Sequence, residues 1–130
     1  MSTSRVRSIP TIAAAIVLAA SATVAQADPA GKWRVQFENS THNDGTITLR
    51  ISPQGGAPVD AEAKVTKGSG AGFVAKAVRD ALRASLGEGY DVETDDGQDV
   101  VIRTKGQTPK FDLTLAGSTL AGISVRFKKE

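Results

Sequence analysis

Short segments in which apolar and polar residues alternate dominate the sequence after residue 30. In residues 32–38 every second position is apolar, which is the period of a half-buried β-strand. The same alternation recurs in residues 46–52 and, with smaller apolar residues, in residues 61–66. Between the first two segments, residues 39–45 are polar and end in Asn-Asp-Gly, which favours a turn. We therefore expect three strands, with a hairpin between the first two.

One segment, from Phe73 to Leu86, has the period of a helix instead. Its small and apolar residues recur at spacings of three and four and share one stripe: Val74, Ala77, Val78, Ala81, Leu82 and Ser85. Gly87 follows at the position where a glycine of positive φ commonly ends a helix. A half-apolar helix must bury its stripe, and the small inward residues Ala61 and Ala63 of the third strand would let it approach closely.

The alternation returns after the helix and predicts four more strands. In residues 90–104, Asp95-Asp96-Gly97 supplies a three-residue turn, so even-numbered positions pair with each other and share the buried face. Residues 111–115 and 123–128 alternate again. We expect an α+β fold of order βββαββββ, with a mostly antiparallel sheet of about seven strands and one amphipathic helix. A sandwich with an inserted helix is the alternative.

The first 27 residues have the three parts of a secretory signal peptide. Arg5 and Arg7 form a basic region, residues 12–20 are apolar, and Ala25-Gln26-Ala27 is a small-x-small cleavage site. The apolar run is too short to span a bilayer, although an N-terminal membrane anchor is the alternative. We therefore expect a signal peptide over residues 1–27, a single α+β domain over residues 28–130, and a periplasmic or secreted location.

Charge and cysteine content exclude several classes of function. The chain has 16 basic and 14 acidic residues, but Arg5 and Arg7 belong to the leader and no acidic residue precedes Asp28. The mature chain is therefore neutral overall, and its charge predicts no affinity for nucleic acid. The absence of cysteine excludes thiol catalysis, thiolate metal sites and disulfides, so the domain must be held together by its hydrophobic core.

Two clusters could bind a ligand, and each has a simpler structural explanation. Residues 67–72 (Lys-Gly-Ser-Gly-Ala-Gly) precede the helix but match neither G-x-G-x-x-G nor the P-loop, so we expect a flexible connection in which Ser69 caps the helix. Five acidic residues gather at the predicted hairpin: Asp91, Glu93, Asp95, Asp96 and Asp99. They lack the EF-hand pattern, and one exposed hairpin provides no cleft for a glycosidase pair. We expect a solvated turn, no metal and no cofactor.

His42 is the only histidine and lies among hydroxyl and acidic side chains in residues 39–45. A catalytic base must be oriented by one group while it reaches another, which residues crowded into one turn seldom achieve. We therefore expect a protein that is not an enzyme. One alternative is a small secreted hydrolase that uses His42 with nearby hydroxyls or acids. Another is an enzyme-inhibitor domain that projects the loop of residues 39–45.

Six basic residues lie opposite the apolar positions of their strands: Lys32, Arg34, Arg50, Arg103, Arg126 and Lys128. If these strands form one sheet, its outer face is basic. Such a face can also be merely solvated, since antiparallel sheets commonly leave one face to water. The pattern of two strands, a Val-Ala-x-Ala-Val-x-x-Ala-Leu helix, then Val-x-x-x-x-x-Gly and a valine-rich strand resembles small exported bacterial and phage surface modules. This resemblance assigns no family, and no functional residue is carried over from it.

We expect an exported binding or structural module of the cell envelope. Its partner would be anionic: an acidic polysaccharide, lipid head groups or an acidic protein. We expect neither a nucleic-acid partner nor, after processing, a membrane-spanning segment.

Overall fold

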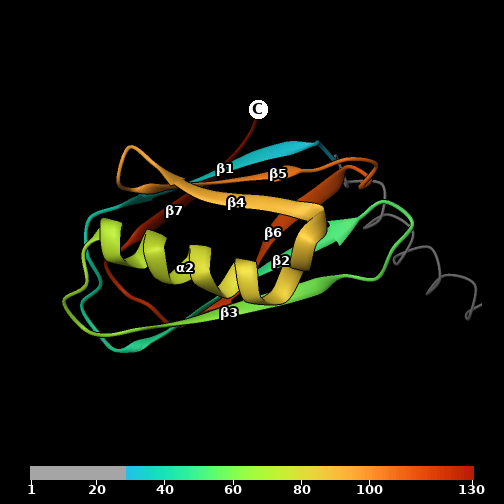
Figure 1. Cartoon of the computed structure of the whole chain (residues 1–130). Coiled ribbons are helices and arrows are strands. Elements are labelled where there is room, and N and C mark those ends of the chain that lie inside the picture. Colours follow the sequence, from blue (N-terminus) through green and yellow to red (C-terminus); the bar gives the residue numbers. More distant parts are fainter. Residues whose placement is uncertain (1–28) are drawn as a thin grey trace, which may run out of the picture.

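The computed structural model describes residues 29–130, in which seven antiparallel strands form two sheets beside one long helix (Figure 1). The first three strands are β1 (Lys32–Glu38), β2 (Gly45–Pro53) and β3 (Val59–Val65). The helix α2 (Ala71–Leu86) and a short 3₁₀ turn η2 (Gly87–Gly89) follow. The chain ends with β4 (Tyr90–Asp95), β5 (Asp99–Thr104), β6 (Phe111–Ser118) and β7 (Ser124–Lys129). The α+β class and the order βββαββββ are thus confirmed.

The strands divide into a four-stranded sheet of order β4-β5-β1-β7 and a three-stranded sheet of order β3-β2-β6. The inward residues of the two sheets form one core together with the helix stripe. β1 and β2 supply the fully buried centre of their sheets, because Val35, Phe37, Leu49 and Ile51 are each at most 1% exposed. The predicted signal peptide and its predicted cleavage site lie outside the described residues.

The predicted hairpin between the first two strands is wrong. β1 pairs with β5 and β7, whereas β2 pairs with β3 and β6. The intervening turn instead carries the chain from one sheet to the other. Its backbone groups bond to two distant loops: Thr41 N–H donates to the carbonyl of Ser69, and His42 N–H donates to the carbonyl of Ala121. A turn signal specifies a local reversal and not the sheet in which the next strand finds its partners.

The helix closes one side of the molecule, between the edge strands β3 and β4 (Figure 1). Ala61 and Ala63 of β3 are buried beneath it, as their small size predicts. Val74, Val78 and Leu82 of the stripe are buried as expected, but Ser85 is exposed. The predicted cap at Ser69 is also wrong. The N-cap residue is Gly70, so no side chain caps the helix, and the Ser69 hydroxyl donates to the carbonyl of Thr66 instead.

In the hairpin of β4 and β5 even-numbered residues pair with each other as predicted, but the register differs by two residues from the one that a loop at residues 95–97 implies. Val92 pairs with Ile102, and Thr94 pairs with Val100, so even-numbered residues face each other. The last pair is Asp95 with Asp99, which leaves a three-residue loop one position later than expected. Gly97 in that loop has φ 77°, which an L-amino acid adopts only at a cost.

Candidate functional site

Five of the six basic residues predicted to form a patch share one face, and the sixth lies elsewhere. The outer face of the four-stranded sheet, turned away from the core, carries Lys32, Arg34, Arg103, Arg126 and Lys128. Arg50 belongs to β2 of the other sheet and binds Asp60 through two bonds of 2.8 and 3.1 Å. The prediction of one basic face assumed that all these strands form a single sheet. Because they form two sheets, Arg50 does not belong to that face.

Arg34 lies at the centre of the outer face and is held by three carboxylates. Its guanidinium donates to Asp99 at 2.8 Å, to Asp95 at 2.9 Å and to Glu130 at 3.0 Å. The side chain is only 17% exposed. These bonds, the one to Glu130 above all, raise the pKa of Arg34, and the bond from Arg34 lowers the pKa of the Glu130 carboxyl. Arg34 therefore ties the hairpin, β1 and the chain end together, and its charge is neutralised locally.

Three other basic residues of this face are paired over longer distances. The N···O distances are 3.6 Å for Lys32–Glu130, 3.8 Å for Arg103–Asp91 and 3.4 Å for Arg126–Glu38. Long, solvent-exposed pairs of this kind contribute little to stability. Their basic side chains can therefore turn toward a partner at low cost, which Arg34 cannot do.

Charge changes sign across the outer face. The outward residues of β4 are the acids Asp91, Glu93 and Asp95, whereas those at the centre of β7 are Arg126 and Lys128. β5 and β1 lie between them and carry both signs. The face is thus not uniformly basic: an anionic partner would meet attraction at the β7 side and repulsion at the β4 side.

A hollow of about 210 Å³ lies on the outer face near β4. Its lining consists of Lys32, Arg34, Glu93, Thr94, Asp95, Val101 and Arg103. Val101 is the one apolar residue among them and is 6% exposed although it faces outward. Since carboxylates and cations line the hollow together, it offers no clear preference for a ligand of either charge.

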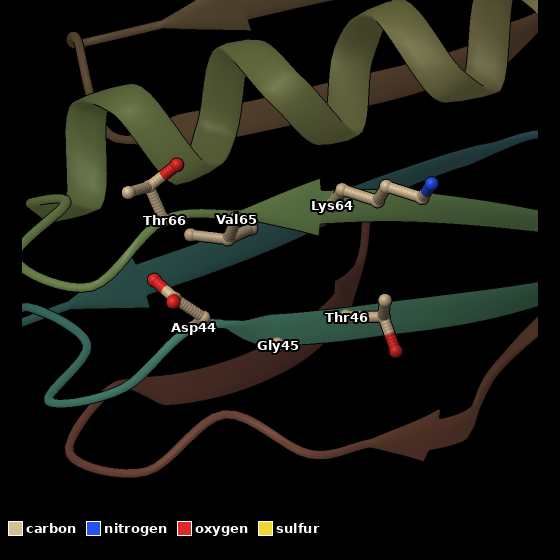
Figure 2. A pocket seen from close by; sticks show the side chains of 6 residues that line it. All are labelled: Asp44, Gly45, Thr46, Lys64, Val65 and Thr66. Carbon is tan, nitrogen blue, oxygen red and sulfur yellow. The ribbon is translucent and has the colours of Figure 1, made fainter.

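A second hollow, of about 400 Å³, lies where β2 begins and β3 ends (Figure 2). It is lined by Asp44, Gly45, Thr46, Lys64, Val65 and Thr66. The Asp44 carboxylate accepts the backbone N–H of Lys67 at 2.7 Å, so it holds the loop in place. Figure 2 shows the Lys64 amine extending along the sheet, away from Asp44. The polar groups therefore do not converge on one point, as those of a catalytic site would.

His42 is exposed in the loop beside this hollow, and its ring lies against Gly122. A Cβ at Gly122 would come within 2.8 Å of ring atoms. The neighbouring hydroxyl, of Thr41, donates to Asn43. Within residues 29–130 no hydroxyl or carboxylate hydrogen-bonds to the His42 ring, so the nucleophile–base contact of a serine–histidine site is not formed there.

The acidic cluster has a role that the sequence did not reveal. Asp95 and Asp99 bind Arg34, which lies about sixty residues away in the chain. In the described part of the chain, no group of three or more His, Cys, Asp or Glu side chains is placed to hold a metal ion. The alternating pattern could place Arg34 and these acids on outer faces. The pairing of β1 with β5, which brings them together, has no local signal.

The fold and these surfaces define a small two-sheet α+β domain, and comparison with known proteins gives it no family. No protein-family model matches the chain, and no curated protein matches it significantly. Within residues 29–130, no helix has the length and hydrophobicity needed to cross a membrane.

Proposed function

We propose that this chain is a small exported binding module of the cell envelope, periplasmic or secreted, that engages an anionic partner. The observation that carries the proposal is the separation of charge on the outer face. Arg34 is held by three carboxylates, whereas Arg126 and Lys128 on the edge strand are exposed. The partner would therefore meet the β7 side of the face, and Arg50 would take no part.

The closely packed interior supports a surface mode of binding. The residues that the two sheets and the helix turn inward form one continuous hydrophobic cluster. Cofactor and substrate sites are usually concave and apolar with a few convergent polar groups. The two hollows described above are shallow or of mixed charge, so the exposed sheet residues are better candidates for recognition than either of them.

The test is retention of the mature protein on an anionic polysaccharide resin at increasing salt. Screening acts over about 8 Å at physiological ionic strength, so retention should fall steeply as salt rises. Arg126→Glu combined with Lys128→Glu should abolish retention. The matched control is Arg50→Glu combined with Lys64→Glu, which reverses two charges on the other sheet and should leave retention nearly unchanged. A wild-type protein that flows through at low salt would show that the proposal is wrong.

A further inference from the structure

The side of the molecule opposite the helix has two free sheet edges. β7 ends the four-stranded sheet and β6 ends the three-stranded sheet, whereas the other two edge strands, β4 and β3, flank α2. Figure 1 shows the helix in front of the sheets, with β6 and β7 behind it. Within residues 29–130 no strand pairs with the outer edge of β7 or of β6, although Ala30 forms a single bridge with Phe111 at the start of β6.

The apolar layer is incomplete along these edges. Leu115 of β6 is 43% exposed, although its partner Leu49 is 1% exposed. Val125 and Phe127 of β7 contact the core but remain half-buried, while their partners on β1 are fully buried. Inward-facing apolar residues are therefore left partly in water here, in contrast to the side that the helix covers.

The backbone of β7 is oriented to accept another strand. Glu130 N–H donates to the carbonyl of Lys32 at 2.9 Å, so the even-numbered residues of β7 bond toward β1. Backbone groups of successive residues in a strand point to opposite sides. The N–H and C=O groups of Val125 and Phe127 consequently point to the free side, where they form a template for strand addition.

We propose that the free edge of β7 binds an extended segment of a partner protein in which acidic residues alternate with apolar ones. The inference rests on the proposed function and identifies its anionic partner as a peptide strand. Acidic residues on the outer face of that strand would lie beside Arg126 and Lys128. Its apolar residues would point inward beside Val125 and Phe127 and cover surface that is now exposed.

A second copy of this chain fits the edge less well. Pairing of β7 with another β7 would place Arg126 and Lys128 next to the same cations, which is unfavourable. The chain's own acidic alternating strand is β4, but its free edge faces the helix. There Arg83 donates to the carbonyl of Val92 at 2.9 Å and occupies one of the groups that pairing would need. The occupant is therefore a segment of another protein.

The test titrates the mature protein with a synthetic peptide of alternating valine and glutamate, with a valine–lysine peptide as control. Binding is followed by amide hydrogen exchange, which should slow at Val125 and Phe127. Val125→Pro removes an N–H that points away from β1 and should weaken peptide binding about tenfold or more, while Val125→Ala should weaken it much less. Retention on the anionic polysaccharide resin should be the same for Val125→Pro and wild type. A glutamate peptide N-methylated on alternate residues tests the same bonds without altering the protein.

The outcomes separate this inference from the proposed function. Binding of the glutamate peptide but not the lysine peptide, lost on N-methylation, supports strand addition. Equal binding of the methylated and unmethylated peptides overturns it, because attraction would then need no backbone bonds. Retention on the polysaccharide resin without peptide binding overturns strand addition and leaves the proposed function in place. If neither probe binds, both are wrong.

Discussion

At the scale of single residues, the outer face contains basic side chains of two kinds. Arg34 donates three bonds of 2.8 to 3.0 Å and is largely covered, whereas Arg126 is 67% exposed and makes one contact of 3.4 Å. The sequence places both on the outward side of their strands, but it does not distinguish them. The distinction depends on which strands are neighbours, because the acids that surround Arg34 come from the hairpin and from the chain end.

The first prediction compares the two residues. Arg34→Ala should lower the free energy of unfolding by about 1–3 kcal/mol, because it leaves Asp95, Asp99 and Glu130 without their shared donor. Arg126→Ala should cost no more than about 0.5 kcal/mol, as is usual for an exposed pair. Urea unfolding of both variants measures the difference. Equal losses would contradict the central role of Arg34.

The second prediction concerns pH. The folded-state pKa of Glu130 is lowered, first by its bond from Arg34, so this carboxylate adds stability above its unfolded-state pKa. That stability is lost as pH falls from the unfolded value, 4.5, through the lowered folded value. The free energy of unfolding of the wild-type protein should therefore decrease below about pH 4.5. The free energy of unfolding of the Glu130→Gln variant should decrease less over the same pH range. Urea unfolding at a series of pH values measures this. A parallel pH dependence in the two proteins would contradict the assignment.

At the scale of elements, the sequence predicted the types and phases of the strands well. The helix, the buried faces of the first three strands and the pairing of even-numbered residues in the β4–β5 hairpin all follow from period and turn chemistry. Four expectations were wrong at this scale: the hairpin between β1 and β2, the position of the β4–β5 loop, the cap at Ser69 and the burial of Ser85. Each of these features depends on which residues are neighbours in the folded structure. Periodicity could not predict them, because it reflects only the spacing of residues along the chain.

The third prediction tests the orientation of the helix. Leu82 is fully buried, so Leu82→Ala should cost about 2–5 kcal/mol. Ser85 has the same place in the predicted stripe but is exposed, so Ser85→Ala should change stability by less than about 0.5 kcal/mol. Thermal and denaturant melts of the two variants provide the comparison. A large loss for Ser85→Ala would mean that the helix is rotated about its axis.

At the scale of the whole molecule, the division into two sheets was the feature that the sequence could not supply. All seven strands have one inward face, which a single curved sheet and a sandwich explain equally well. The partition places Arg50 away from the other basic residues and leaves β6 and β7 as free edges on one side. The candidate binding surface therefore depends on strand order. From the sequence, the alternation could show that all six basic residues point outward, but it could not show that only five of them share one sheet.

The fourth prediction concerns export. The sequence of the first 27 residues has the three regions of a signal peptide, so the mature protein should begin at Asp28. The intact mass of the protein recovered outside the cytoplasm measures the cleavage site. A protein that retains the leader would contradict the proposed processing and favour an N-terminal membrane anchor.

The central claim is that the β7 side of the outer face recognises an anionic partner. The most direct measurement is a titration of the isotopically labelled mature protein with polyglutamate at low salt, followed by backbone amide chemical shifts. We predict that the largest shifts fall on residues 124–129, and that they disappear in the Arg126→Glu, Lys128→Glu double variant. Shifts centred on the loop hollow of Asp44 and Lys64, or no shifts in any residue, would contradict the claim.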